Sequence, residues 1–89
     1  MVRYTSIKAY YQEIPKLSTK RRKILRAFVD GDMSNREASL LLNIPINQVT
    51  GRVLELRQMG LLVEKGREID QMTKKLVTIW GLPLNNGQL

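Results

Sequence analysis

Four consecutive cations, Lys20, Arg21, Arg22 and Lys23, are the first side chains in this sequence whose types and spacing suggest chemistry. Ser18 precedes them and is suited to cap a helix, which would place all four in its first turn. Cations at this end of a helix oppose its dipole, at a cost of about 0.3–1 kcal/mol each. Because local stability does not favour them there, we expect Lys20, Arg22 and Lys23 to contact phosphate. The alternative is an ordinary solvated helix face.

The charge of the whole chain points to the same class of partner. Lys and Arg total 15 and Asp and Glu total 8, so the 89 residues carry a net charge of +7. An excess this large on a small protein attracts polyanions, of which nucleic acid is the most common.

Histidine and cysteine are both absent from the sequence. Their absence excludes imidazole general bases, thiol nucleophiles, disulfides and zinc fingers. The carboxylates are scattered, and Asp30-Gly31-Asp32 lacks the ligand spacing and closing Glu of a calcium loop. No glycine-rich phosphate loop precedes a predicted helix. We therefore expect no enzyme activity, no metal ion and no cofactor.

Length and composition fit one small globular domain. Hydrophobic residues make up 43% and charged residues 26% of the chain, which is ordinary for a folded protein. No apolar run approaches the roughly 20 residues of a membrane span, and the first residues lack the apolar region of a signal peptide. We expect a cytoplasmic protein with no membrane partner.

Apolar residues near the N-terminus follow a helical period. Tyr4, Ile7, Tyr11 and Ile14 are spaced to form one stripe along a helix. We predict an extra N-terminal helix within residues 1–16. Its stripe would pack either on the core of its own domain or on a second copy of the chain.

A second helix is predicted from Ser18 to about Asp30, where Gly31 would end it. Met33 follows as a lone apolar residue between polar ones and would connect to the core through a very short strand. The buried face of this helix would consist of Ile24, Leu25 and Phe28, joined by the stem of Arg21.

Two further helices are predicted with a tight turn between them, which is the pattern of a helix-turn-helix. Ser34 and Glu37 form a capping box at the start of the first. Asn43 suits the left-handed position at its end, and Pro45 suits the start of the next helix. That helix would run to residue 59 and stop at Gly60.

The second helix of this pair has distinct buried and exposed faces. Val49, Val53 and Leu56 form its buried stripe at helical spacing. Because each residue turns the helix by about 100°, the same spacing also predicts which side chains lie on the opposite face and on its two shoulders. Asn47, Gly51, Leu54 and Gln58 would face outward, with Thr50 on one shoulder and Gln48 and Arg52 on the other.

After Gly60 the hydrophobic period changes from that of a helix to that of a strand. Residues 61–69 and 76–80 are rich in Val, Ile and Leu that alternate with polar residues, which predicts a hairpin. Its turn over residues 70–75 carries Lys74 and Lys75 beside the tip.

These elements together resemble the winged helix-turn-helix family of small prokaryotic and phage DNA-binding proteins, broadly of the MarR and GntR type. The resemblance covers residues 17–80 and is carried by Ser34-x-x-Glu37, Ile44-Pro45 before Gln48-Val49-Thr50, and Met59-Gly60-Leu61-Leu62. It implies a mainly α fold with a small β-hairpin. The winged helix-turn-helix domain would span residues 17–82, after the extra helix over 1–16 and before a flexible tail over 83–89.

In that family the second helix of the motif enters the major groove, and the hairpin (the wing) reaches the backbone or a minor groove. Carried over to this chain, the resemblance implies base contacts by Asn47, Thr50 and Gly51, with Gln48 and Arg52 beside them. Asn and Gln can form two hydrogen bonds with adenine, and the Thr methyl can touch a thymine methyl. The phosphate contacts that the resemblance implies are Ser34, Asn35 and Arg36 at a helix start and Lys65, Arg67, Lys74 and Lys75 on the wing.

Three residues of the predicted reading helix have an alternative role. Asn47 would serve as a helix cap. Arg52 lies near the buried stripe, so its stem would pack while its head pairs with Glu55 or Glu37. Leu54 is apolar on the outward face, which favours a protein partner over DNA.

The sequence as a whole predicts a small transcriptional regulator that binds double-stranded DNA with the helix over 46–59 in the major groove. We expect a homodimer formed through the N-terminal helix, a phage or prokaryotic origin, and no small-molecule ligand. The alternatives are a winged-helix module for protein–protein interaction and a replication or recombination accessory that binds DNA with little sequence preference.

Overall fold

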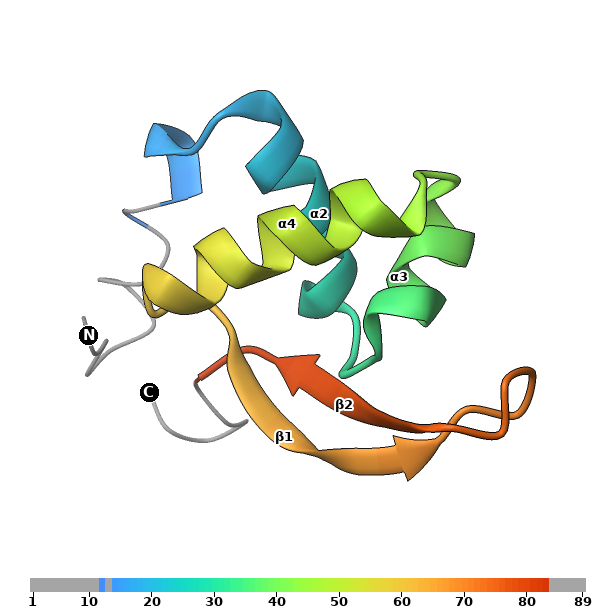
Figure 1. Cartoon of the computed structure of the whole chain (residues 1–89). Coiled ribbons are helices and arrows are strands. Elements are labelled where there is room, and N and C mark those ends of the chain that lie inside the picture. Colours follow the sequence, from blue (N-terminus) through green and yellow to red (C-terminus); the bar gives the residue numbers. More distant parts are fainter. Residues whose placement is uncertain (1–11, 13, 84–89) are drawn as a thin grey trace.

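Three α-helices precede a two-stranded hairpin in the computed structural model, which describes residues 12 and 14–83. In Figure 1, α4 lies across α2, and α3 stands beside the start of α4. The hairpin runs below the helices, and its loop extends beyond α3. This is the predicted order of elements. In chain order they are a short 3₁₀ helix η1 (Ile14–Lys16), α2 (Thr19–Val29), α3 (Asn35–Leu42), α4 (Ile46–Gln58), β1 (Val63–Ile69) and β2 (Leu76–Gly81).

The two predicted end segments lie mostly outside the described residues. Of the helix predicted over 1–16, Gln12 is helical and Ile14–Lys16 forms η1. Of the tail predicted over 83–89, Pro83 is described.

The helix starts follow the predicted caps. The Ser18 hydroxyl accepts a hydrogen bond from the backbone N–H of Arg21 at 3.3 Å, at the start of α2. In α3 the Ser34 hydroxyl accepts from the backbone N–H of Glu37, and the Glu37 carboxylate accepts from the backbone N–H of Ser34, both at 3.2 Å. The capping box and the end of α3 are therefore confirmed, since Asn43 has φ 55° and ψ 46°.

Two glycines predicted to end helices behave differently. Gly60 has φ 78° and allows the backbone N–H of Leu61 to reach the carbonyl of Leu56 at 2.9 Å, which closes α4. Gly31 does not adopt the left-handed conformation. The helix α2 nevertheless ends where predicted, with Val29 as its last residue and Asp30 as its C-cap in right-handed conformation, so Gly31 follows the helix without a left-handed turn.

The core lies between the three helices and the segment that follows α4. Its members include the predicted stripes of α2 and α4, and Leu61 and Leu62 are also fully buried. The first strand therefore begins at Val63 and not at residue 61, because the Leu61 backbone completes the end of α4. The fully buried large side chains are Ile24, Leu25, Phe28, Val49, Val53, Leu56, Leu61 and Leu62.

The hairpin is tied to the helices through Met33. Its backbone forms an isolated bridge with Trp80 of β2, with hydrogen bonds of 3.0 and 2.8 Å. β1 and β2 pair antiparallel from Val63 opposite Gly81 to Ile69 opposite Leu76, with an irregularity between residues 64 and 66. The prediction that Met33 connects to the core through a short strand is confirmed, and this bridge fixes where the hairpin leaves the domain.

Candidate nucleic-acid interface

The face of α4 that points away from the core is exposed along its length, as the helical spacing predicted. Asn47, Thr50, Gly51 and Gln58 are exposed, and Leu54 is 49% exposed. Pro45 occupies the N-cap position of α4, and no side chain of the described residues caps this helix. The alternative role of Asn47 as a helix cap was therefore wrong.

The two flanks of α4 face different parts of the protein. Gln48, Arg52 and Glu55 lie on the flank toward α2. On the opposite flank, Thr50 faces the hairpin and the Arg57 guanidinium lies 5.5 Å from the centre of the Trp80 ring. The exposed face of α4 thus runs as a ridge between two hollows.

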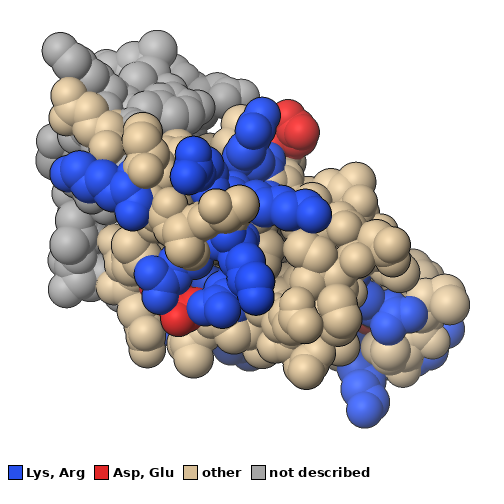
Figure 2. Space-filling model, turned by 90° about the horizontal axis from the view of Figure 1, so that it is seen from above, with Lys and Arg blue, Asp and Glu red and all other residues tan. Residues whose placement is uncertain are grey.

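The first hollow, the α2–α4 groove, combines cations with an apolar floor. Its volume is about 530 Å³. Lys20 and Lys23 of α2 line it opposite Arg52 of α4, and Figure 2 shows Lys and Arg side chains gathered over this face. The groove is lined by Lys20, Lys23, Ile24, Ile44, Asn47, Gln48, Gly51, Arg52 and Glu55. It therefore brings two of the predicted phosphate contacts next to two of the predicted base contacts, Asn47 and Gly51, and next to Gln48 and Arg52 beside them.

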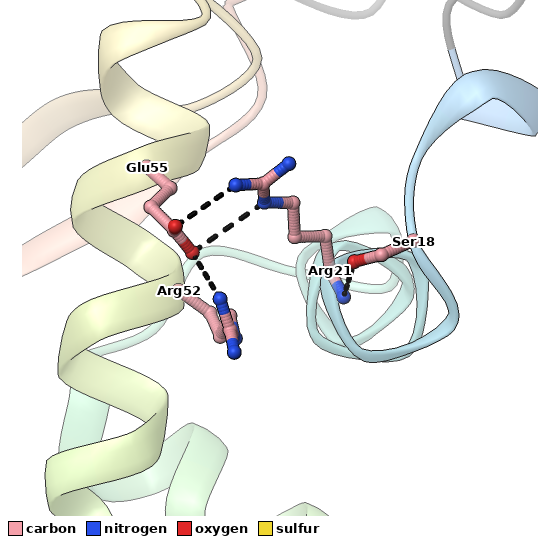
Figure 3. Close-up of polar contacts among 4 residues, drawn as sticks. All are labelled: Ser18, Arg21, Arg52 and Glu55. Carbon is pink, nitrogen blue, oxygen red and sulfur yellow. Dashed lines mark hydrogen bonds and ion pairs between the residues drawn. The ribbon is translucent and has the colours of Figure 1, made fainter.

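Glu55 joins the two walls of this groove (Figure 3). Its Oε2 lies 2.8 Å from Nη2 of Arg21, and its Oε1 accepts from Nη1 of Arg52 at 2.6 Å and from Nε of Arg21 at 3.4 Å. The hydrogen bonds from Arg21 and Arg52 lower the pKa of Glu55 from 4.5 to about 2. The carboxylate is therefore ionised at neutral pH and binds both guanidinium groups. The predicted pairing of Arg52 with Glu55 is present.

Arg22 lies apart from the neighbouring cations of its helix. Its Nη2 donates to the backbone carbonyl of Leu17 at 3.5 Å, and its Nε is buried without a hydrogen-bond partner among the described residues. Arg22 is partly buried and does not line the α2–α4 groove. The four consecutive cations are thus divided. Lys20 and Lys23 line the α2–α4 groove, Arg21 pairs with Glu55, and Arg22 lies outside the groove.

The second hollow, the α4–hairpin groove, lies on the other flank of α4 and has a volume of about 430 Å³. Thr50 of α4 and Lys75 of the hairpin loop line it, together with the start of α3. Its lining residues are Ser34, Asn35, Arg36, Ile46, Thr50, Asp70, Thr73, Lys75, Leu76, Val77, Thr78 and Trp80. Cations therefore stand on both sides of the α4 ridge.

The three residues predicted as phosphate contacts at the start of α3 differ in access. Ser34 is 2% exposed, and its hydroxyl accepts the capping hydrogen bond. Asn35 and Arg36 are partly buried, and Nε of Arg36 forms an ion pair of 3.5 Å with Oδ2 of Asp70. Ser34 is thus a structural cap, whereas Arg36 reaches toward the hairpin loop.

Asp70 organises the hairpin loop. Its Oδ1 accepts from the backbone N–H groups of Met72 and Thr73 at 2.7 and 3.1 Å, and its backbone carbonyl accepts from Lys74 at 2.8 Å. The backbone N–H of Thr73 lowers the pKa of Asp70, with further contributions from Met72 and Arg36. Lys74 takes a left-handed conformation, φ 60°. These contacts stabilise the loop, and Lys74 and Lys75 are exposed on it.

The other cations of the wing are spread along it. Lys74 and Lys75 are exposed in the loop, and Lys65 is exposed in β1. Arg67 pairs with Glu64 on its own strand at 3.7 Å. In Figure 2, a second group of Lys and Arg lies toward the end of the molecule where Figure 1 places the hairpin loop.

The sequence interpretation missed two links that shape this surface. The pairing of Arg21 with Glu55 joins residues 34 positions apart, and no local spacing signals it. The Arg36–Asp70 pair joins α3 to the hairpin loop in the same way. A local signal did exist for the loop itself, because Asp at the start of a turn commonly accepts hydrogen bonds from backbone N–H groups two and three residues later.

Residues 12 and 14–83 contain neither a membrane span nor a metal cluster. No helix in this part of the chain is long and apolar enough to cross a membrane. The same residues contain no cluster of three or more acidic side chains that could hold a metal ion.

Comparison with known proteins identifies the fold. No protein-family model matches the sequence, and no curated protein matches it either. Among solved structures, one described as a possible transcriptional regulator from Methanosarcina mazei Go1 is similar, with a TM-score of 0.64 and 14% identity over 90% of this chain and 68% of that chain. The adhesin competence repressor AdcR from Streptococcus pyogenes is similar with a TM-score of 0.61 and 20% identity, over 85% of this chain and 55% of that chain.

Both descriptions name regulators of transcription, and neither names an enzyme. The chain spans little more than half of the second structure. Three helices followed by an antiparallel hairpin, with α3 and α4 joined by a tight turn, confirm the predicted fold. The protein has the winged helix-turn-helix fold of solved transcriptional regulators.

Proposed function

We propose that this protein is a transcriptional regulator that binds double-stranded DNA, with α4 in the major groove and the hairpin on the backbone or in a neighbouring minor groove. One observation carries the proposal. The exposed ridge of α4 has cations on both flanks, Lys20 and Lys23 across the α2–α4 groove and Lys75 across the α4–hairpin groove. A helix has the diameter of a major groove, and the two phosphate backbones that border that groove need such cations on either side.

The residues of the ridge have the chemistry to read bases. The Asn47 amide can donate to and accept from an adenine edge, and the Thr50 hydroxyl can bond either kind of edge. Gln48 can form the same hydrogen bonds with adenine on the flank of α4 toward α2. Gly51 presents bare backbone, which allows close approach. These roles are proposals for this chain and are supported by the exposure of all four residues.

The cations that border the ridge would fix its position through phosphate. Arg52 is turned along the α2–α4 groove by Glu55, which leaves part of its guanidinium for an outside anion. Lys65, Arg67, Lys74 and Lys75 would do the same for the wing, and Asn35 and Arg36 for the start of α3. Ser34 would contribute indirectly by capping α3, and Arg22 would contact phosphate outside the α2–α4 groove.

A pair of variants with equal charge tests the position of the interface. Lys23 lines the α2–α4 groove, whereas Arg26 is exposed on the same helix and does not line it. Lys23→Ala and Arg26→Ala each remove one positive charge. We expect Lys23→Ala to weaken binding to a mixed-sequence duplex several-fold more than Arg26→Ala at fixed salt, because only Lys23 borders the ridge. Equal losses would indicate attraction by net charge alone.

The same assay separates a regulator from a DNA-binding accessory. Sites selected from a random oligonucleotide pool should bind at least about a thousandfold more tightly than competitor DNA at one salt concentration if the protein is a regulator. A ratio near one would assign it to binding without sequence preference.

A second candidate function is supported by a different surface. Leu40 of α3 and Met72 of the hairpin loop are 68% and 75% exposed and line a cleft of about 270 Å³ between α3 and the hairpin. Exposed apolar side chains around a cleft are typical of protein-binding surfaces. A protein-interaction module would use this cleft in place of the α4 ridge, so Leu40→Ala would abolish its binding and leave DNA binding unchanged.

We further propose a homodimer built on the N-terminal segment. Its support is the apolar spacing of Tyr4, Ile7 and Tyr11 in the sequence, whereas Ile14, the last residue of the predicted stripe, packs against the core of its own domain. Two copies related by a two-fold axis would present their α4 helices to half-sites about one turn of DNA apart.

A further inference from the structure

The exposed ridge of α4 is more apolar than it would need to be if it recognised DNA bases by hydrogen bonds alone. Leu54 is 49% exposed and Ile46 is 47% exposed, with Thr50 exposed between them. These residues are four positions apart, so they follow one another in a row along the helix. The row ends in a large aliphatic side chain on the outward face.

Internal packing explains neither Leu54 nor its neighbour Gly51. Leu54 belongs to the exposed face, whereas Val53 and Leu56 fill the core. A Cβ atom added to Gly51 would meet nothing within 4 Å, and Gly51 has no left-handed φ. Glycine is therefore not required by the fold at this position. Its effect is to lower the surface beside Leu54, so that a partner can approach the leucine closely.

The surroundings of the row limit what can cover it. Cations line the hollows on both flanks, Lys20 and Lys23 on one side and Arg36 and Lys75 on the other. Each hollow also holds one carboxylate, Glu55 or Asp70, that is paired with arginine, so cations are in excess on both flanks of the first half of the row. An apolar row with cations on both flanks is complementary to a surface with an apolar strip between two lines of anions. The major groove of DNA has this arrangement wherever the C5-methyl groups of thymine project between the phosphate backbones.

We infer that Leu54, together with Ile46 and the methyl group of Thr50, packs against the C5-methyl groups of thymine, so that the protein prefers sites with thymine under the second half of α4. This inference rests on the proposed function and adds the class of sequence that α4 selects. Asn47 at the start of the ridge would read adenine by hydrogen bonds, and Leu54 would add a contact that no other unmodified base can supply.

Uracil provides the test, because it pairs as thymine does and lacks only the C5-methyl group. The probes are two short duplexes of alternating sequence, one of dA and dT and the other of dA and deoxyuridine. Burial of one methyl group is worth roughly fourfold in affinity. We expect the wild-type protein to bind the dT duplex at least about fourfold more tightly than the deoxyuridine duplex.

Three variants assign the effect to the row. Leu54→Ala should bring the ratio of the two dissociation constants close to one, and Leu54→Met should retain most of the wild-type ratio. Leu40→Ala removes a comparably exposed leucine from α3, away from the ridge, and should keep the wild-type ratio. Since Leu54 is half-exposed, all three proteins should unfold near the wild-type temperature, which thermal unfolding checks.

Each outcome decides the inference. Equal binding of the two duplexes by the wild-type protein overturns it and leaves the proposed function intact. A wild-type ratio that survives in Leu54→Ala also overturns it, because the methyl groups are then sensed elsewhere. Binding to the mixed-sequence duplex but to neither alternating duplex overturns it as well. A protein that binds none of the three duplexes contradicts the proposed function itself, and the inference with it.

Discussion

Oε2 of Glu55 on α4 lies 2.8 Å from Nη2 of Arg21 on α2, and the two residues are 34 positions apart in the chain. The same carboxylate binds Arg52, one turn earlier on α4. These contacts hold the two walls of the α2–α4 groove together and orient a cation along it. An exposed ion pair by itself contributes little to stability, so the main consequence is the shape and the charge distribution of the groove.

The first prediction concerns the stability of the protein in acid. The folded-state pKa of Glu55, about 2, lies below the ordinary value of 4.5. Its ion pairs therefore stabilise the folded protein fully above about pH 4.5, and this stabilisation is lost as the pH falls through 2. We expect the melting temperature of Glu55→Gln to lie below that of the wild type at neutral pH and to converge with it on acidification. Glu68→Gln on the exposed side of β1 is the control, and a constant difference across the whole pH range would contradict the prediction.

The second prediction concerns the base contacts. Asn47→Ala and Thr50→Ala should each cost about 1–3 kcal/mol on the preferred site and relax the preference at one or two base pairs. Both residues are exposed, so the melting temperature should not change. Competition assays with single-base variants of the selected site measure the effect. If both variants bind as the wild type does, α4 does not read bases and the protein-interaction alternative takes first place.

The third prediction concerns the wing. Lys74 and Lys75 are exposed in the hairpin loop, where a long cation can reach phosphate. Removal of either lysine should weaken binding to all duplex sequences alike and lower the slope of log K against log salt by about one. A loss of preference among sequences would instead show that the loop contacts bases.

The fourth prediction concerns the shape of the hairpin loop. Asp70 accepts from the backbone of Met72 and Thr73 and pairs with Arg36. Asp70→Ala should therefore speed amide hydrogen exchange in residues 71–75 and leave exchange in α4 unchanged. It should also weaken DNA binding, because the lysines of the loop lose their fixed position. Unchanged exchange in the loop would show that the two strands alone determine its conformation.

The fifth prediction concerns the oligomeric state. If the N-terminal stripe pairs two copies of the chain, sedimentation of the full chain over a micromolar range should show a monomer–dimer equilibrium. Replacement of Ile7 and Tyr11 by Ser should shift it to monomer. A wild-type protein that remains monomeric throughout would place the stripe in the core of its own domain.

The sequence by itself was sufficient for most local features of the fold. The caps at Ser18 and Ser34, the left-handed Asn43 and the stripe of Val49, Val53 and Leu56 were all predicted correctly. Each depends on side chains a few residues apart, which act through backbone hydrogen bonds or a helical period. The helical period that placed Val49, Val53 and Leu56 on the buried side of α4 also predicted which residues lie on its exposed side.

Tertiary structure decided the features that depend on contacts between distant parts of the chain. The sequence offered Arg52 as a partner of Glu55, and the packing of α2 on α4 brought Arg21 to the same carboxylate. The strand starts at Val63 and not at residue 61 because the core takes both leucines that follow Gly60. Arg22 and Lys23 are adjacent in sequence but lie on different sides of α2, so only Lys23 borders the groove. Spacing along the chain determines which residues share a helix face, whereas the partners that a face meets are determined by how the helices and the hairpin pack.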